Sequence, residues 1–143
     1  MKINDVVHGK SSQDVVTISP DATVRDLIAL LAEHNVGALV VSDDGERVSG
    51  IVSERDVVRH LHRDADVLEL TVSRIMTTDV RTCAADDGVT DLMHTMTELR
   101  IRHVPVVADG RLTGIISIGD VVKSRIGELE FERDQLDTYL HQT

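Results

Sequence analysis

The hydrophobic and polar positions along the chain follow two periods in a fixed order. The first signal is a run rich in β-branched residues, VVTIS at positions 15–19, which is typical of a strand. Thr23, with Asp26 three residues later, is a helix-opening capping pair. The apolar positions that follow have helical spacing, at Val24, Leu27, Ile28 and Leu31. This part of the chain therefore predicts a strand and then an amphipathic helix.

The next apolar positions predict a β-hairpin and a second helix. A continuous apolar run, VGALVV at positions 36–41, ends in the turn signal SDDGE. Its hairpin partner is RVSGIVS at positions 47–53, and the pattern returns to helical spacing at Glu54. The full order is strand, helix, strand, strand, helix.

This order occurs twice. The stretch GIVSERDVVRHL at positions 50–61 has a near-copy, GIISIGDVVKSR, at positions 114–125, an offset of 64. Upstream, the segments that begin at Asp14 and Asp79 align at an offset of 65. The second copy is therefore one residue shorter between the two aligned stretches, which predicts a tighter hairpin there. A weaker match, INDVV near the N-terminus with VSRIM before the second copy, predicts a short helical turn ahead of each unit.

The fold class predicted from the duplication is α/β, with two β-α-β-β-α repeats that share a core. Units of about 60 residues bury too little surface to be comfortable alone, so the two copies are expected to pack together. We expect the first repeat over residues 1–63, the second over 64–126, and a helical tail over 127–143.

Composition and charge narrow the function. Apolar residues make up 41% of the chain, with one Phe, one Tyr and no Trp, so the core is expected to be aliphatic and base stacking on aromatics is disfavoured. Fifteen Lys and Arg stand against 25 Asp and Glu, a net charge of −10 that repels nucleic-acid backbones. Neither a signal segment nor an apolar run of about 18 residues is evident, so we expect a cytoplasmic protein with no membrane insertion. The single cysteine, Cys83, is expected to be a buried strand residue.

Each copy of the repeated stretch contains a Ser-x-x-Asp motif between a strand and a helix. The pairs are Ser53 with Asp56 and Ser117 with Asp120. One interpretation is structural, because Ser is a favoured N-cap and Asp stabilises a first helical turn. The other is ligand binding, because a helix N-terminus offers N–H groups to phosphate and a carboxylate can accept both hydroxyls of a ribose. The two interpretations are compatible, and duplication alone does not separate them.

The repeated motifs resemble those of CBS domains, the family named after cystathionine β-synthase. The resemblance rests on the G-h-h-[ST]-x-x-D ending of each hairpin, where h is apolar, on RHVPVV before the second hairpin, and on the order of the elements. It covers nearly the whole chain and implies a tandem pair packed sheet to sheet with pseudo-twofold symmetry. It also implies two clefts, which in this family commonly bind ligands that contain adenosine.

The resemblance implies roles for individual residues. Asp56 and Asp120 are expected to hold ribose hydroxyls, and Ser53 and Ser117 to face the phosphate. The base is expected against the first strand and the following turn of each copy, at Thr17, Ser19, Pro20, Thr82, Ala84 and Ala85. The RHVPVV segment adds four further candidates, which are Arg102, His103, Val104 and Pro105.

An anionic ligand on an acidic protein needs local positive charge, and the two copies differ in it. The second copy supplies Arg100, Arg102 and His103, whereas the first has uncharged residues there, namely Asn35, Gly37 and Ala38. The two clefts are therefore expected to be chemically unequal. A side chain of one repeat can reach the ligand of the other, so the sequence leaves open which cleft Arg102 serves. The other basic residues of the motif helices could add charge to the clefts, but we favour a solvent-facing position for each of them, namely Arg55, Arg59 and Lys123.

We predict a ligand-sensing regulatory module that binds an adenine nucleotide, with AMP favoured over ATP, ADP, NAD(H) and S-adenosylmethionine. No cofactor is required beyond this regulatory ligand, and the regulated partner is left unidentified. The alternative is a structural or interaction protein whose clefts are vestigial. An enzyme is disfavoured, because the sequence has no Walker loop, no GxGxxG and no nucleophile elbow. The polar cluster after the first motif helix is interpreted as a solvated helix end rather than a metal site, at His60, His62, Asp64 and Asp66.

The segment after the second copy has no counterpart after the first. Its apolar positions recur about every 3.5 residues and are interrupted by Arg133, at Val122, Ile126, Leu129, Leu136 and Leu140. This stripe can pack on its own domain or on a second subunit, and we favour the second because the duplicated core leaves the tail little to cover. A homodimer is therefore expected.

Overall fold

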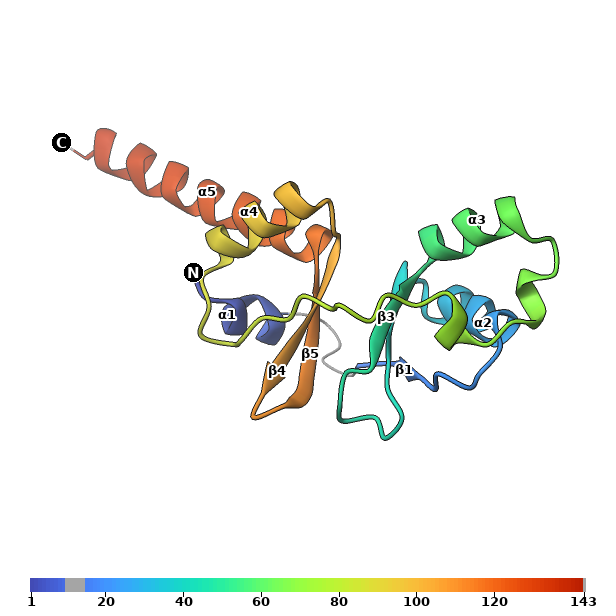
Figure 1. Cartoon of the computed structure of the whole chain (residues 1–143). Coiled ribbons are helices and arrows are strands. Elements are labelled where there is room, and N and C mark those ends of the chain that lie inside the picture. The colour runs from blue at the N-terminus through green and yellow to red at the C-terminus, as the bar shows by residue number, and fades with distance from the viewer. Residues whose placement is uncertain (10–14, 143) are drawn as a thin grey trace.

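The computed structural model describes residues 1–9 and 15–142 and shows two lobes side by side (Figure 1). Each lobe has a small sheet toward the centre of the molecule and helices on the outside. Asp14, where the first copy was expected to begin, lies outside the described residues. The order strand, helix, strand, strand, helix is found in the first lobe and, with its first strand reduced to a single bridge, in the second, which confirms the α/β fold class.

The first lobe contains a three-stranded sheet in the order β1-β2-β3. Strand β1 is parallel to β2, and β2 is antiparallel to β3. The strands are shorter than the apolar runs that predicted them. The elements of this lobe are β1 Thr17–Ile18, α2 Val24–His34, β2 Ala38–Val41, β3 Gly50–Ser53 and α3 Glu54–Arg63, followed by a 3-10 turn at Val67–Glu69.

The second lobe repeats this plan with a reduced first strand. Its hairpin strands β4 and β5 are antiparallel. The position of β1 is taken by one parallel bridge between Cys83 and Val106, which corresponds at the offset of 65 to the pairing of Ile18 with Val41. The elements of this lobe are α4 Val89–Leu99, β4 His103–Ala108, β5 Arg111–Ser117 and α5 Ile118–Leu140.

The two hairpins differ in length, as the repeat offsets predicted. Strands β4 and β5 are joined by Asp109 and Gly110, both with positive φ, which is the backbone conformation that a tight two-residue hairpin turn needs. In the first lobe, residues 42–49 connect β2 to β3, and the buried Ser42 hydroxyl accepts a hydrogen bond from the Gly45 backbone N–H at 2.9 Å. The tighter turn of the second copy is confirmed.

The short helical turns ahead of the two copies are both present, but they are exchanged between the lobes. Helix α1, Ile3–His8, buries Ile3 and Val6 in the core of the second lobe. The 3-10 turn Val72–Arg74 precedes the second copy in sequence, yet Val72 is buried in the core of the first lobe. Each lobe is therefore completed by a segment that comes just before the other repeat in the sequence.

Two equivalent glycines let these segments cross the sheets. A Cβ on Gly50, at the start of β3, would lie 2.8 Å from both the Met76 Sδ and the Thr77 carbonyl oxygen. Gly114 holds the same repeat position in β5, and a Cβ there would lie 3.3 Å from Val7 Cγ1. A side chain at Gly50 would push the crossing segment off the strand, whereas one at Gly114 would need only a small shift of Val7.

The cores are aliphatic, as the composition predicted, and both aromatic residues of the chain, Phe131 and Tyr139, are exposed. The buried core of the first lobe consists of Ile18, Val24, Leu27, Leu39, Val41, Val52, Val57, Val67, Val72 and Ile75. The buried core of the second lobe consists of Ile3, Val6, Cys83, Val89, Leu92, Met96, Val104, Val106, Ile116 and Val121.

The expected tail helix is a direct continuation of the second motif helix. Helix α5 has 23 residues without a break, whereas its counterpart α3 has 10. The C-terminal half of α5 projects away from both lobes (Figure 1), and every residue from Leu129 to Leu140 is exposed. Among the described residues, no helix combines the length and the apolar character needed to cross a bilayer.

Candidate ligand-binding site

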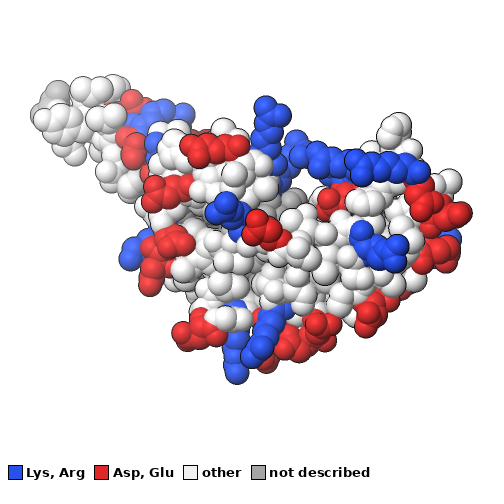
Figure 2. Space-filling model, viewed as in Figure 1, with Lys and Arg blue, Asp and Glu red and all other residues white. Residues whose placement is uncertain are grey.

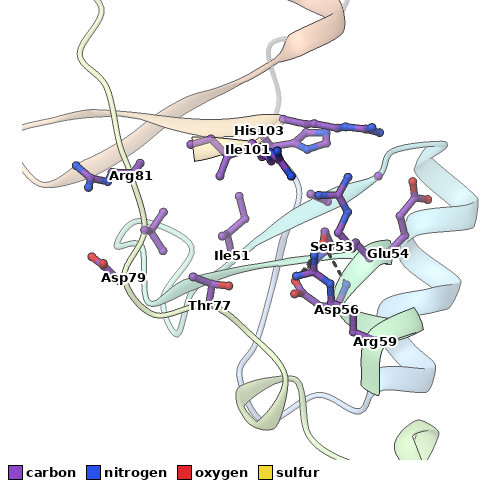
Figure 3. Close-up of a pocket in the computed structure, with 16 residues that line it drawn as sticks. Ile51, Ser53, Glu54, Asp56, Arg59, Thr77, Asp79, Arg81, Ile101 and His103 are labelled. Carbon is purple, nitrogen blue, oxygen red and sulfur yellow. Dashed lines mark hydrogen bonds between the residues drawn. The ribbon is translucent and has the colours of Figure 1, made fainter. Parts of the chain in front are cut away.

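A pocket with a volume of about 250 Å³ lies between the two lobes, beside the N-terminus of α3. Four stretches of chain meet around it, which are the start of β2, β3 with the first turns of α3, the segment 77–81, and the connection from α4 to β4. Figure 3 shows Asp79 and Arg81 on one side of the pocket and Asp56 and Arg59 on the other, with His103 above. The pocket is therefore built from both repeats.

Ser53 and Asp56 form a reciprocal cap at the mouth of this pocket. The Ser53 backbone N–H donates to Asp56 Oδ2 at 2.8 Å, and the Ser53 hydroxyl donates to the same oxygen at 3.1 Å. The Asp56 backbone N–H in turn donates to Ser53 Oγ at 3.3 Å. Within the described part of the chain, Asp56 Oδ1 accepts no hydrogen bond, so this oxygen can accept one from a ligand.

The capping arrangement alone does not mark a binding site. The same reciprocal box occurs at Ser117 with Asp120, and also at Thr23 with Asp26 at the start of α2. Thr23 and Asp26 do not line the pocket. What distinguishes Ser53 and Asp56 from Thr23 and Asp26 is their position at the pocket, so the capping role is seen here and the ligand-binding role stays a prediction.

The pocket gathers positive charge in an acidic protein. Its lining includes five arginines against three carboxylates, those of Glu54, Asp56 and Asp79, in a chain whose net charge is −10. In the part of the chain that the structure describes, none of these arginines forms an ion pair with a carboxylate. Figure 2 shows basic side chains along α3 and beside the hollow between the lobes. The five residues are Arg55, Arg59, Arg81, Arg100 and Arg102.

Arg102 and His103 lie in the pocket next to the first motif, Ser53 and Asp56. A basic segment of the second repeat thus lies beside the motif of the first, and a role for Arg102 in this cleft stays a prediction. His103 lies beside Gly37, where there is room for a methyl group in ordinary van der Waals contact. A Cβ at Gly37 would lie 3.5 Å from both His103 Cε1 and Glu54 Oε1.

Eight other residues expected from the resemblance do not line this pocket, and they are Thr17, Ser19, Pro20, Thr82, Ala84, Ala85, Val104 and Pro105. The crossing segments use two of them, since the Ser73 N–H donates to the Pro20 carbonyl at 3.0 Å and the Asn4 N–H donates to the Ala85 carbonyl at 2.9 Å. Val104 is buried within β4, as part of the core of the second lobe. The structure thus gives these turns and strands a clear packing role.

The lining also contains residues that sequence reasoning missed or interpreted differently. The segment with Thr77, Asp79 and Arg81 was not a candidate, and it reaches the pocket because Ile51 and Thr77 pair where the chain crosses β3. Arg55 and Arg59 were expected to face solvent, and they are exposed but also line the pocket. The only sequence signal for the missed segment is its polar character between two apolar runs, which is too common to be specific.

The second Ser-x-x-Asp motif has a different environment. Asp120 and Lys123 border a shallow concavity between α1 and α5, where Asp5 is the other charged residue. By the repeat offset, the wall that corresponds to Thr77 and Asp79 falls on residues 12–14, which lie outside the described residues. The described part of this concavity therefore has one cation against two carboxylates, the reverse of the balance beside Asp56.

The polar cluster after α3 does not converge on one point. The His60 ring Nδ1 lies 2.9 Å from the carbonyl oxygen of Asp56, one turn earlier in the same helix. Asp64 Oδ1 accepts from the Asp66 backbone N–H at 2.8 Å. Across the described residues, no group of three or more His, Cys, Asp or Glu side chains is arranged to hold a metal ion.

Cys83 is buried against β4, with Sγ 3.7 Å from the Pro105 carbonyl oxygen. Burial raises the pKa of this thiol to about 12, and the negative charge of Asp87 acts in the same direction. The thiol therefore stays protonated at neutral pH, which fits the expected role as a packing residue.

Comparison with known proteins identifies the family. The CBS domain family matches residues 3–63 and 72–127, and the chain belongs to this family as a tandem pair of CBS domains. Over 146 aligned residues it is 37% identical to the CBS domain-containing protein CBSX3, mitochondrial, of Arabidopsis thaliana, covering 96% of this chain and 71% of the plant protein.

Solved structures of similar sequence share the fold. The CBS-domain containing protein ATU1752 from Agrobacterium tumefaciens is 42% identical, with a TM-score of 0.82 over 87% of this chain and 92% of that one. The CBS domain pair of protein MJ0100, solved in complex with 5-methylthioadenosine and S-adenosyl-L-methionine, is 26% identical, with a TM-score of 0.78 over 90% of this chain and 98% of that one. A relative of this chain thus binds ligands that contain adenosine.

Proposed function

We propose that this protein is a regulatory module that senses an adenine mononucleotide, with AMP as the preferred ligand, in the pocket beside Ser53 and Asp56. The observation that supports this most directly is a group of five arginines around Asp56, which have no carboxylate partner among the described residues, together with an Asp56 oxygen that accepts no hydrogen bond from them. An acidic protein that keeps such a group unpaired is suited to an anionic ligand with hydroxyl groups.

The roles follow from hydrogen-bonding capacity. Asp56 accepts the ribose hydroxyls through the oxygen that the cap leaves open. The N-terminus of α3 and the arginines around it attract the phosphate, because aligned N–H groups and guanidinium groups both favour negative charge. Ser53 keeps its capping role and holds Asp56 in place.

Charge and size favour AMP over the other adenosine compounds. The lining carries an excess of two positive charges, which matches a phosphate monoester of charge near −2 at neutral pH. The cationic sulfonium of S-adenosylmethionine gains nothing from this field. The volume of about 250 Å³ lies at the small end of ligand pockets, which favours a mononucleotide over ATP or NAD.

A thermal-shift comparison of AMP, adenosine, ATP, NAD and S-adenosylmethionine tests the proposal. Ligand at 100 times its dissociation constant adds about 2.7 kcal/mol of stability, which is a rise of about 5–10 °C for a chain of this size. We expect the largest rise with AMP and a smaller one with adenosine. If no adenosine compound raises the melting temperature, the proposal is wrong and the alternative of vestigial clefts is favoured.

We further propose that occupancy of the pocket is read out by a partner protein or by a second copy of the chain, rather than by chemistry on the ligand. The pocket joins residues of both repeats, so a bound ligand links the two lobes. The cytoplasmic location expected from the sequence stays a prediction.

A further inference from the structure

A shallow groove adjoins the pocket on the side of the second lobe. Helices α4 and α5 lie side by side in this lobe (Figure 1), and the groove lies where the last turn of α4 meets the first residue of α5. Its apolar part consists of Met96, Ile101 and Ile118. Met96 is buried and the two isoleucines are half-buried against the core of this lobe. We call it the arginine groove, for the residues that border it.

Three arginines border the arginine groove. Arg100 and Arg102 come from the second repeat, and Arg55 reaches the groove from α3 of the first lobe. All three are exposed, and within the described residues none of them forms an ion pair with a carboxylate. The lining of the groove contains no Asp or Glu. Unneutralised cations therefore lie beside an apolar surface.

The first lobe has an equivalent groove that lacks the positive charge. At the repeat offsets of 64 and 65, five lining residues of the arginine groove correspond to residues that line a groove between α2 and α3, which are Leu31, Ala32, Asn35, Val36 and Glu54. None of these residues is basic, and Glu54 is acidic. The fold therefore forms this groove without arginines, so packing does not explain their presence in the second lobe.

The backbone of Arg100 adds an independent observation. Arg100 ends α4 in the left-handed region, with φ 55° and ψ 42°, and its N–H donates to the Met96 carbonyl. The equivalent Asn35 ends α2 in the same conformation, with φ 53°. Helices that end in this way favour Gly or Asn at this position, because a larger side chain makes the left-handed backbone less stable. An arginine here lowers stability, which indicates a role for its side chain.

The chemistry of the arginine groove fits an acidic peptide better than a nucleotide or a nucleic acid. A guanidinium group binds a carboxylate through two parallel hydrogen bonds, and the flexible side chain of Met96 can adapt to an apolar partner. A nucleotide would find no carboxylate in this groove to accept from its ribose hydroxyls. Nucleic acid is repelled at long range by the net charge of −10.

We propose that the arginine groove binds an acidic segment of a partner protein. Carboxylates of this segment pair with the three arginines, and an aliphatic side chain beside them packs against Met96, Ile101 and Ile118. Arginine clusters are a general means of recognising acidic segments, and the opposite charges also speed the encounter of the two proteins. The segment is thus a second ligand, bound outside the pocket beside Ser53 and Asp56.

The arginine groove and the pocket share residues, so their ligands affect each other. Arg55, Arg100 and Arg102 line both. A nucleotide phosphate in the pocket and a carboxylate in the groove therefore compete for the same guanidinium groups, and each ligand weakens the binding of the other by the same factor. Nucleotide binding then releases the acidic partner. This consequence, unlike the binding of the segment itself, rests on the proposed function.

Fluorescence anisotropy with the full-length chain at low ionic strength tests the groove. The probe is a labelled peptide of Glu and Leu residues, and its control is the same peptide with Gln in place of every Glu. We expect the Glu peptide to bind at least about tenfold more tightly, because its contacts with arginine are charge-assisted. If the Glu peptide does not bind, or if the two peptides bind equally, the proposal is wrong.

Thr97→Glu separates the arginine groove from the pocket. Thr97 is exposed and lines the groove but not the pocket, so a glutamate there pairs with the arginines and repels the peptide. We expect a loss of about tenfold in affinity for the Glu peptide. Thr90→Glu adds the same charge at an exposed position near the start of α4 and should leave the affinity unchanged. Equal affinities of Thr97→Glu and the wild type overturn the proposal.

Arg100→Asn gives the second lobe the residue of the first. We expect about tenfold weaker binding of the Glu peptide together with a higher urea midpoint, because Asn tolerates the left-handed backbone better. Arg47→Asn removes the same charge from the connection between β2 and β3, which lines neither the groove nor the pocket, and is the control. A variant that keeps its peptide affinity, or that is less stable than the wild type, contradicts the role of Arg100.

Sedimentation velocity of the free protein tests a second copy of the chain as the occupant. We expect the wild type and Thr97→Glu to have the same mass at every concentration. If Thr97→Glu dissociates an assembly that the wild type forms, a second copy occupies the groove and the assignment to a partner protein is wrong.

Adding AMP tests the competition separately. In a chain that binds AMP by calorimetry, we expect saturating AMP to raise the dissociation constant of the Glu peptide several-fold. An unchanged constant at saturation overturns the competition, whereas the peptide measurements without AMP still decide the groove. If AMP does not bind at all, the proposed function fails and the result for the groove stands on its own.

Discussion

The two lobes share their backbone pairing almost bond for bond, yet they differ in the chemistry of their motifs. The Val72 N–H donates to the Ala22 carbonyl at 2.8 Å, and the equivalent bond in the second lobe, from Ile3 to Asp87, is 2.9 Å. A second crossing bond, from the Val24 N–H to the Leu70 carbonyl at 2.9 Å, recurs from the Val89 N–H to the Met1 carbonyl at 3.1 Å.

The two lobes differ in the residues that surround their motif carboxylates, Asp56 and Asp120. Asp56 faces arginines from three stretches of chain, whereas the described surroundings of Asp120 contain a single lysine. Folding requires the same backbone contacts in both lobes, but a ligand site depends on which side chains meet there. A duplicated sequence can therefore keep two similar folds while the described surroundings of its two motifs differ in arginine content.

The strongest test of this inequality replaces the two aspartates in turn. We expect Asp56→Ala to weaken AMP binding by about 10–100-fold, because the ribose hydroxyls lose their acceptor, a cost of about 1–3 kcal/mol. Asp120→Ala should change the affinity much less. Titration calorimetry measures both variants, with Asp26→Ala as the control for loss of a cap away from the pocket. Equal losses at Asp56 and Asp120 would show that both clefts bind alike.

The equivalent glycines should differ in how well they tolerate a methyl group. Gly50→Ala places a Cβ 2.8 Å from a backbone carbonyl, so we expect a loss of about 1–3 kcal/mol in the free energy of unfolding. Gly114→Ala meets only a valine methyl at 3.3 Å, and its loss should be smaller. Gly127→Ala, which meets nothing in helix α5, should stabilise the chain by about 0.5–1 kcal/mol. Urea denaturation measures the free energy of unfolding of the three variants. If Gly114→Ala loses as much stability as Gly50→Ala, the two glycines do not differ as expected.

The basic segment of the second repeat, which contains Arg102, should bind the phosphate of AMP rather than its nucleoside part. We expect Arg102→Ala to weaken AMP binding about tenfold and adenosine binding hardly at all, because the lost contact is charge-assisted. Added salt should reduce the difference between the losses of AMP affinity and adenosine affinity, because salt screens charge–charge attraction. Arg111→Ala, which removes a surface partner of Glu46, is the control. Equal losses for AMP and adenosine would indicate that Arg102 packs rather than binds phosphate.

The smallest effect is expected at the first-strand positions, where Ile18 corresponds to Cys83. The pKa of Cys83 is raised from 9.0 to about 12, so between these pH values the unfolded chain releases the thiol proton and the folded chain keeps it. The unfolded state then binds fewer protons, and stability falls as pH rises from 9 to 12. Urea midpoints at pH 8 and pH 10 should therefore fall further for the wild type than for Cys83→Val. Identical decreases would contradict the raised pKa.

Much of the fold could be predicted from local patterns. Helical spacing identified α2, the duplication extended this prediction to α4, and Thr23 with Asp26 marked the start of α2. The missing residue after Gly110 predicted the tight hairpin, because a two-residue turn with positive φ favours Asp-Gly. These features depend on a few neighbouring residues, which the sequence displays directly.

The candidate site could be predicted only in part. The sequence indicated Ser53, Asp56, Arg102 and His103, and the structure brings these four together. The sequence did not indicate Thr77, Asp79 or Arg81, and it favoured a solvent-facing position for Arg59. All four residues line the pocket. The turns expected to hold the base make backbone contacts with the crossing segments, at Pro20 and Ala85, and their role toward a ligand stays a prediction.

By itself, the sequence determined the duplication, the order of elements, the helix caps, the aliphatic core and the unequal distribution of arginines. Only the tertiary structure decided that α1 completes the second lobe, that the turn at Val72 completes the first, and that Arg102 faces Asp56. The physical reason is the range of the interactions. Periodicity and capping act over three or four residues, whereas the site depends on where the chain crosses between lobes, at glycines whose neighbours in space are about 26 residues or more away in sequence.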